Sequence, residues 1–297
     1  MIIVDDVQIT EVEAKNILNT YQKIDSWFGI KCCINIYRGC QHACVYCDTR
    51  SECYGIIDLN KITVKINAPE LLKQSLKRKR EKHTIGFGSM NDPYMPIEKK
   101  YGLTRQCLEV ISTNKFPIHI ITKSNLILRD IKLIKEISKI YSAVSFTITT
   151  ADDELASIIE PHAPSPSQRF EAMSILSIAG IYTGVTLMPV LPFIEDTEEN
   201  ITSIIDKAKD AGASYIISSM GMTLRDKQRE YYYNFLDQYD PDIKEKYVSK
   251  FTKYYHVSSP NYKNLKKVLA NRCSYHGLPM KMKSYYQVCT EKQLELF

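Results

Sequence analysis

The strongest constraint on the fold is a regular alternation of short apolar runs with amphipathic stretches. Six runs rich in β-branched residues predict strands at 32–37, 84–89, 117–122, 143–149, 182–188 and 214–219. Apolar residues at helical spacing predict helices at 68–81, 103–114, 126–140, 167–179 and 198–211. Repeated strand–helix units predict right-handed crossovers and a parallel α/β sheet. Six units favour an open or partial barrel, and a doubly wound sheet is the alternative that periodicity leaves open.

The pattern changes after residue 221. Two further helical stretches, 225–236 and 261–276, lie in sequence that is otherwise polar, basic and rich in tyrosine. No clean linker separates this region from the alternating units. We therefore expect a barrel domain at residues 1–222 and a C-terminal extension at residues 223–297 that packs on it.

Three cysteines follow the first predicted strand, in the stretch GCQHACVYC at residues 39–47. Cys40, Cys44 and Cys47 lie within eight residues, so their thiolates can converge on one metal centre. Three sulfurs leave a four-coordinate site one ligand short, which suits a catalytic centre better than a structural one. The alternatives are a zinc site completed by His42, which lies only two residues from Cys40, and three unrelated buried thiols.

This C-x3-C-x2-C spacing resembles the signature of radical S-adenosylmethionine enzymes, and Tyr46 fills the aromatic place before the last cysteine. The resemblance implies a partial (βα)6 barrel that holds a [4Fe–4S] cluster on Cys40, Cys44 and Cys47. It also implies that S-adenosylmethionine binds the fourth iron. Reductive cleavage of this cofactor would then yield a 5′-deoxyadenosyl radical that abstracts hydrogen from a substrate.

More narrowly, the chain resembles the spore photoproduct lyase-like group, also called DNA repair photolyases. The matching stretches are residues 35–52, 88–94, 103–105, 122–130, 146–150 and 184–192. This resemblance implies a substrate that is a nucleic acid and a lyase-like reaction. It also implies an electron donor of the flavodoxin or ferredoxin type.

The resemblance assigns cofactor contacts at the ends of the predicted strands, where a parallel barrel gathers its functional residues. Asn91, with Asp92 beside it, matches the segment that holds the methionine amino group. Lys123 matches a lysine near the cofactor carboxylate, where a cation makes a charge-assisted contact. Thr147 corresponds to a ribose contact and Met188 to an adenine contact. Each assignment has an alternative. Residues 91–92 could form an ordinary turn, and Lys123 could be a solvated lysine. Thr147 could reflect strand propensity alone, and Met188 could be a core methionine.

Two positions depart from the lesion-repairing lyases. Ser89 stands where those enzymes carry a cysteine hydrogen donor, and Asp48 stands where they carry a tyrosine. A serine hydroxyl is a poor hydrogen-atom donor, so the repair reaction itself is not carried over. Ser89, Asp48 and Cys53 are the candidate catalytic residues, and Cys32 or Cys33 could also reach the site.

The C-terminal extension carries most of the positive charge. Residues 243–290 contain nine lysines and Arg272 against a single acid, Glu245. The aromatic residues among them are Tyr247, Phe251, Tyr254, Tyr255, Tyr262, Tyr275, Tyr285 and Tyr286. Cations contact phosphates and aromatic faces stack on bases, so this segment is a candidate DNA or RNA surface. The alternative is half-buried tyrosines beside a solvated lysine face.

The sequence contains no run of 18 apolar residues and no signal-peptide pattern, which favours the cytoplasm and no membrane partner. The sequence leaves two other functions open. One is a radical enzyme that acts on a peptide or small molecule, with the tail as a lid. The other is a non-catalytic iron–sulfur or zinc protein.

Overall fold

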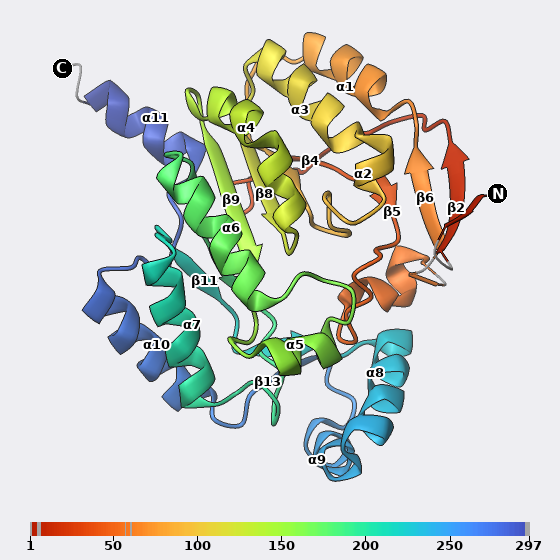
Figure 1. Cartoon of the computed structure of the whole chain (residues 1–297), viewed down its shortest axis with the longest axis vertical. Coiled ribbons are helices and arrows are strands. Elements are labelled where there is room, and N and C mark those ends of the chain that lie inside the picture. Colours follow the sequence, from red (N-terminus) through yellow and green to blue (C-terminus); the bar gives the residue numbers. More distant parts are fainter. Residues whose placement is uncertain (1, 5–6, 57, 60, 295–297) are drawn as a thin grey trace.

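The centre of the molecule is a seven-stranded sheet in the order β11-β10-β9-β8-β7-β4-β3 (Figure 1). The computed structural model describes residues 2–4, 7–56, 58–59 and 61–294. The strands are β3 (Leu18–Thr20), β4 (Cys32–Ile34), β7 (Ile85–Phe87), β8 (Ile118–Thr122), β9 (Ser142–Thr147), β10 (Tyr182–Leu187) and β11 (Ile216–Ser218). The six strands from β4 to β11 pair in parallel and in chain order, while β3 closes one edge antiparallel. This open arrangement confirms the predicted partial barrel.

Helices cover the outer face of this sheet (Figure 1). They are α1 (Ala68–Lys77), α3 (Leu103–Asn114), α4 (Ile131–Ser138), α6 (Pro166–Ile178) and α7 (Glu198–Asp210). Leu72, Leu108 and Ile134 from three of them are fully buried against strand residues such as Ile118 and Ile120. Burial of each such side chain contributes roughly 1.5–3 kcal/mol, so this single core fixes the barrel on which the site is built.

The first predicted strand divides into two. After β4 ends at Ile34, the chain enters β5 (Tyr37–Arg38), which belongs to a second sheet of order β1-β2-β6-β5. The other strands of that sheet are β1 (Ile2–Val4), β2 (Val7–Val12) and β6 (Lys61–Lys65). The sheet lies at the N-terminal side of the barrel (Figure 1). The sequence patterns did not predict this sheet: β1 and β5 are only three and two residues long, while β2 and β6, of six and five residues, lie outside the repeated strand–helix units.

Short helices lie in the loops between these elements. They are η1 (Asp48–Arg50), η2 (Glu52–Tyr54), α2 (Glu98–Tyr101), η3 (Asn125–Asp130) and α5 (Asp153–Ile159). The predicted helix at 126–140 therefore begins as a 3-10 turn. Asp130 ends that turn as a buried carboxylate that accepts hydrogen bonds from Arg105 and Arg129.

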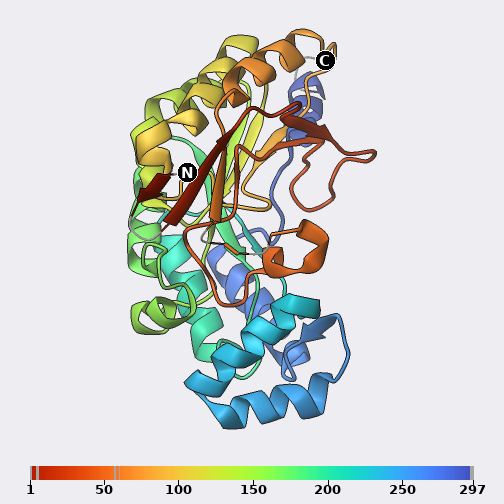
Figure 2. The same cartoon turned by 90° about the vertical axis from the view of Figure 1, so that its right-hand side faces the viewer.

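The C-terminal residues form a tyrosine-rich extension that packs on the barrel and on the short turns η1 and η2. It contains β12 (Gly221–Thr223), α8 (Asp226–Tyr239), α9 (Pro241–Phe251), β13 (His256–Ser258), α10 (Tyr262–His276) and α11 (Tyr285–Leu294). Helix α10 packs against α7, and β12 pairs with β13. Figure 2 shows α8 beside the short turns that follow the cysteine loop. Among the described residues, no helix combines the length and apolar character needed to cross a membrane.

Gly88 allows β7 and β8 to approach closely where the site begins. Its φ is +90°, and a Cβ added there would lie 2.0 Å from the carbonyl oxygen of Ile121. We expect Gly88→Ala to lower the free energy of unfolding by about 2–4 kcal/mol, because a backbone atom must move. Gly277→Ala is the matched control, since its φ is +63° but no atom lies within 4 Å of the added Cβ.

Gly277→Ala should lower the free energy of unfolding by only about 1 kcal/mol, because it adds the strain of the left-handed backbone and no close contact. Urea unfolding of the metal-free protein measures both variants. Equal losses would contradict the close contact at Gly88.

Candidate functional site

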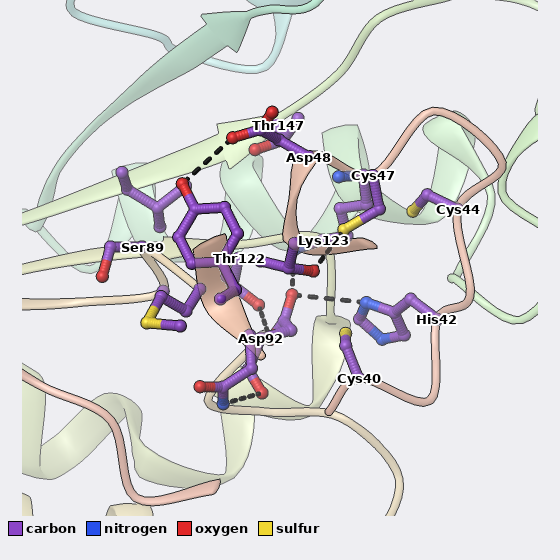
Figure 3. Close-up of a pocket in the computed structure, with 16 residues that line it drawn as sticks. Cys40, His42, Cys44, Cys47, Asp48, Ser89, Asp92, Thr122, Lys123 and Thr147 are labelled. Atoms are coloured by element: carbon purple, nitrogen blue, oxygen red, sulfur yellow. Dashed lines mark hydrogen bonds and ion pairs between the residues drawn. The ribbon is translucent and has the colours of Figure 1, made fainter. Parts of the chain in front are cut away.

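The three motif cysteines line one side of a cavity of about 180 Å³. Two successive backbone turns shape their loop, with the amide of Ala43 bonded to the carbonyl of Cys40 at 3.3 Å and that of Cys47 to Cys44 at 3.2 Å. These turns bring thiols three and four residues apart to the same wall. Figure 3 shows the three cysteines on one loop, across the pocket from Ser89.

Burial makes these thiols weak acids in the metal-free protein. It raises the pKa of Cys40 to about 12, with a smaller contribution from Asp92, and raises the pKa of Cys44 further still. The thiolate is the form that binds metal, so loading the site must release protons. An electropositive group near the sulfurs would favour that release.

The residues present fit an iron–sulfur cluster better than a single ion. No three His, Cys, Asp or Glu side chains in the described part of the chain are grouped as ligands of one metal ion. A cluster offers a separate iron to each thiolate, so its ligands need not meet at one point. The same cavity is lined by buried Asn91, whose Oδ1 has no hydrogen-bond partner in the protein. A polar ligand in the cavity would satisfy this atom.

Asp92 joins the cysteine loop to the strand ends. Its Oδ1 accepts hydrogen bonds from the Thr122 hydroxyl at 2.7 Å and the Tyr94 amide at 2.8 Å. Its Oδ2 accepts the Lys123 amide at 2.7 Å and lies 3.5 Å from Nδ1 of His42 (Figure 3). The carboxylate is therefore occupied by the protein, and Asp92 positions the cavity wall while its neighbour Asn91 keeps a free oxygen.

Lys123 reaches the cavity from the end of β8. Its Nζ lies 3.6 Å from Oε1 of Glu160, and Glu160 in turn pairs with the fully buried Arg169 at 2.5 Å and accepts the Tyr46 hydroxyl. Burial alone would lower the pKa of Lys123, but Cys44 and Glu160 outweigh it and leave the pKa raised. The lysine therefore stays charged beside the cysteines.

Sequence reasoning missed Glu160 and Arg169. Arg169 also donates to the carbonyl of Thr147 at 3.0 Å, so it fixes the end of β9. The available signal was that Glu160 and Arg169 flank the proline-rich stretch at 161–166. Only the fold brings that stretch behind the cysteine loop.

A second cavity, of about 870 Å³, continues from the first into the barrel. The two share a wall that contains Cys47, Asp48, Ser89 and Thr147. Tyr46 and Met188 line the larger cavity alone, while Asn91, Asp92 and Lys123 line only the smaller one. The fold thus brings nearly every candidate residue to one continuous space at the carboxyl ends of the strands.

Asp48 connects this space to the C-terminal extension. Its Oδ1 accepts the Thr223 hydroxyl at 2.6 Å and lies 3.2 Å from Nε of Arg225, and its Oδ2 accepts the Tyr54 hydroxyl at 3.0 Å. The buried Gln228 of α8 also donates to the carbonyl of Tyr46 at 3.1 Å. The extension therefore braces the cysteine loop directly.

The structure does not bring Cys53 or Cys32 to the site, whereas Cys33 lines the larger cavity. Cys32 belongs to the main hydrophobic core. Cys53 is exposed, lines neither cavity, and lies 3.8 Å from Nη1 of Arg225. The short turn η2 directs it outward. Its sequence distance from Cys47 suggested a reach that the local helical turn removes.

A comparison with known families decides what kind of site this is. The model of the Radical SAM superfamily matches residues 34–208, which span the cysteine loop and Lys123. This chain belongs to the radical SAM superfamily. It is therefore an enzyme whose cofactors are a [4Fe–4S] cluster and S-adenosylmethionine.

Relatives of this radical SAM protein include one of known activity. An uncharacterized protein of Methanocaldococcus jannaschii is 37% identical over 196 residues, covering 65% of this chain and 71% of that protein. The radical SAM Nalpha-GlyT isomerase of Pseudomonas phage M6 is 26% identical over 178 residues, covering 60% of this chain and 36% of that protein.

Among solved structures, the fold is similar to spore photoproduct lyase complexed with dinucleoside spore photoproduct. The TM-score is 0.69 at 16% sequence identity, over 94% of this chain and 82% of that chain. Another structure of that enzyme contains bound AdoMet. At this identity the likeness concerns the fold.

Glu195 is a buried acid in the loop after β10, close to the charges of Glu160 and Lys123. Its Oε2 accepts the amide of Leu191 at 2.9 Å. Burial raises the pKa of Glu195 to about 8, from 4.5 in an ordinary environment, so the carboxyl is protonated at neutral pH.

This raised pKa predicts a pH-dependent stability. The contribution of protonated Glu195 is complete below about pH 4.5 and is lost as the pH rises through about 8, at up to roughly 1.4 kcal/mol per pH unit. We expect Glu195→Gln to unfold at a higher temperature than the parent protein at pH 9, with little difference at pH 5. Glu199→Gln, an exposed change on α7, is the control. Parallel pH profiles for parent and Glu195→Gln would show that Glu195 does not titrate in this range.

Proposed function

We propose that the protein holds its [4Fe–4S] cluster on Cys40, Cys44 and Cys47 and uses S-adenosylmethionine to start a radical reaction on a nucleic acid. The observation that carries the cluster assignment is the cavity itself. It combines three thiols, a charged lysine and an unpartnered buried amide oxygen. These are groups for a sulfur-bound cluster, a carboxylate and an amine respectively.

Each residue around the cavity has a proposed task. When bound, the cluster and S-adenosylmethionine supply a one-electron cleavage that initiates radical chemistry. Asn91 binds the amino group through Oδ1, and Lys123 binds the carboxylate. Thr147 contacts the ribose, and Met188 packs on the adenine from the deeper cavity. Tyr46 orients the loop through its hydrogen bond to buried Glu160.

The proposed division of the chain follows these tasks. The barrel domain, residues 1–222, carries the cofactor contacts, and the extension, residues 223–297, braces the cysteine loop and borders the larger cavity. The β12–β13 pair, which spans this boundary, lines that cavity through Thr223 and His256 and joins the two parts.

A nucleic-acid substrate is supported by the surface beside the larger cavity. Tyr254 and Tyr255 are 64% and 57% exposed, and they lie between Lys253 and the cavity-lining His256. The guanidinium of Arg225 lies 4.9 Å from the centre of the Tyr255 ring. Cations and exposed aromatic rings at a cavity mouth suit phosphates and an unstacked base. The structurally similar spore photoproduct lyase, which is complexed with a dinucleoside spore photoproduct, supports the same class.

The rest of the segment 243–290 contributes less than its composition predicts. Tyr247 and Phe251 are buried in a cluster around α8 and α9, while Tyr262 and Tyr285 pack against cores of the barrel. Tyr275 is exposed but lies on α10 and lines neither cavity. We therefore limit the proposed interface to the mouth of the larger cavity.

We further propose a reducing partner of the flavodoxin or ferredoxin type and a location in the cytoplasm. Cys40, Cys44 and Cys47 must stay unoxidised to bind the proposed cluster, and a reducing compartment keeps thiols in that form. The second candidate function is a radical reaction on a peptide or small molecule. The volume of the larger cavity, about 870 Å³, can accommodate such a substrate and favours this function over any non-catalytic metal protein.

Radical initiation is tested anaerobically with protein reconstituted with iron and sulfide. We expect dithionite and S-adenosylmethionine to give 5′-deoxyadenosine with the parent protein, detected by mass spectrometry. The Cys40→Ala, Cys44→Ala, Cys47→Ala triple variant should give none, because the cluster loses its ligands. Cys289→Ala, on α11, should match the parent. Absence of product from parent protein with a full cluster would refute radical initiation.

The substrate class is tested by binding to single-stranded DNA and RNA oligonucleotides at several salt concentrations. Loss of one base-stacking ring costs about 1–3 kcal/mol, so Tyr255→Ala should weaken binding about tenfold. Lys253→Gln should reduce the slope of log affinity against log salt concentration by about one, because one phosphate contact is lost. Tyr275→Ala is the control and should bind normally. Salt-insensitive or absent binding would favour the peptide or small-molecule alternative.

A further inference from the structure

Another cavity, of about 680 Å³, adjoins the larger one at the loop between β3 and β4. Ile24, Asp25 and Ser26 of this loop line both cavities. At the end of β11, Ser218 lines the 680 Å³ cavity, and its neighbour Ser219 lines the larger one. The two cavities therefore share a wall, and a long ligand bound in one can continue into the other.

Hydrogen bonds within the loop fix its shape. The amide of Asp25 donates to the carbonyl of Ile30, and the amide of Gly29 donates to the carbonyl of Asp25, both at 2.9 Å. Oδ2 of Asp25 accepts the amides of Trp27 at 3.2 Å and Phe28 at 2.6 Å. The carboxylate is thereby occupied by the backbone of its own loop, which presents Trp27 in a defined place.

The loop is also packed against the opposite wall of the 680 Å³ cavity. Gly29 has a φ of +65°, and a Cβ added there would lie 2.5 Å from the Cβ of Ser284. Phe28 points inward, with its ring centre 5.0 Å from that of His119. Trp27 lines the cavity and remains 48% exposed. An anchored backbone therefore holds an indole ring that solvent can reach.

The walls of this cavity combine exposed apolar side chains with a cation. Ile24 and Met280 are 42% and 47% exposed, and with Trp27 they form an apolar patch of the kind that marks a binding site. Lys281 lines the same cavity, and Lys23 lines the larger cavity on the shared loop. Both lysines are exposed, and neither forms an ion pair with a carboxylate among the residues that the structure describes.

We propose that the 680 Å³ cavity binds a nucleotide that flanks the one held in the larger cavity. The base of this flanking nucleotide stacks on the indole of Trp27, and its phosphate contacts Lys281. The inference rests on the nucleic-acid function proposed above. It extends that interface from the mouth of the larger cavity across the loop at residues 24–26.

The chemistry of the cavity favours a nucleotide over a purely apolar occupant. An apolar peptide or a second copy of the chain would cover Trp27 but would leave Lys281 without a partner. A nucleotide supplies a flat ring for the indole and a phosphate for the lysine at the same time. Ser218, Ser284 and Gln287 also line the cavity and offer hydrogen bonds to the edge of a base. A volume of about 680 Å³ is that of a small-molecule site.

The first test uses the fluorescence of Trp27, which is the only tryptophan of the chain. We expect short single-stranded DNA or RNA oligonucleotides of mixed sequence to quench this fluorescence in the reconstituted full-length protein, because a stacked base quenches an indole. The quenching should saturate with the same midpoint as binding measured by the anisotropy of a labelled oligonucleotide.

The second test compares the affinities of variants for the same oligonucleotides. Trp27→Ala and Trp27→Leu should weaken binding about tenfold, whereas Trp27→Phe should retain most of the affinity, because only an aromatic ring can stack. Combining Trp27→Ala with Tyr255→Ala should weaken binding about a hundredfold, since the two rings contact different nucleotides. Ile178→Ala, an 85% exposed position on α6 that lines neither cavity, is the control.

The phosphate contact is tested by the salt dependence of binding. Lys281→Gln should reduce the slope of log affinity against log salt concentration by about one. Lys209→Gln, an exposed change on α7, should leave the slope unchanged.

The outcomes separate this inference from the function on which it rests. Salt-sensitive binding that leaves Trp27 fluorescence unchanged, or full affinity in Trp27→Leu, would overturn the flanking site and leave the proposed function intact. Absence of oligonucleotide binding would contradict the nucleic-acid function and the flanking site together. Self-association that Trp27→Ala abolishes, without any response to oligonucleotides, would instead assign the apolar patch to a second copy of the chain.

Discussion

One buried carboxylate holds the parts of the site together. Asp92 accepts hydrogen bonds from the end of β8 and from its own loop, and it lies beside His42 of the cysteine loop. Burial lowers the pKa of His42, so this imidazole is neutral at neutral pH, and the contact does not depend on a second charge. The three cysteines are thereby fixed relative to Asn91 and Lys123. Without this shared anchor, two loops from different strands would move independently.

A second layer of charge supports this anchor from behind. Glu160, Arg169 and Lys123 form a buried ion-pair network that carries a net positive charge beside Cys44. Isolated buried charges are very unfavourable, whereas a paired network with hydrogen bonds to Tyr46 and the Thr147 carbonyl is tolerable. The excess positive charge suits thiolates and a carboxylate. The protein thus prepares the electrostatics of the cavity before any cofactor binds.

The sequence was most informative where chemistry and chain position coincide. The spacing of Cys40, Cys44 and Cys47 is rare enough to predict a metal centre, and the family resemblance assigns Lys123, which follows a clear buried strand. Glu160 was missed because α5, which precedes it, is only seven residues long. Cys33 could not be separated from Cys32 until the strand register fixed which of them faces the cavity.

In the C-terminal extension, composition alone gave a wrong picture of the surface. Composition predicted a broad aromatic surface, but Tyr247 and Phe251 are buried with Ile243 at four-residue spacing on α9. That spacing is the mark of an amphipathic helix, and it was visible in the sequence. Only the pairing of β12 with β13 reveals which of the exposed tyrosines, Tyr255, lies next to a cavity residue.

The central proposal is that Cys40, Cys44 and Cys47 would hold the cluster and that Asn91 and Lys123 would hold S-adenosylmethionine beside it. Electron paramagnetic resonance of the reduced cluster, recorded with and without S-adenosylmethionine, tests this claim most directly. We predict that S-adenosylmethionine changes the g-values of the parent protein and that Lys123→Met requires a higher cofactor concentration for the same change. A fully formed cluster with a spectrum that S-adenosylmethionine leaves unchanged would contradict it.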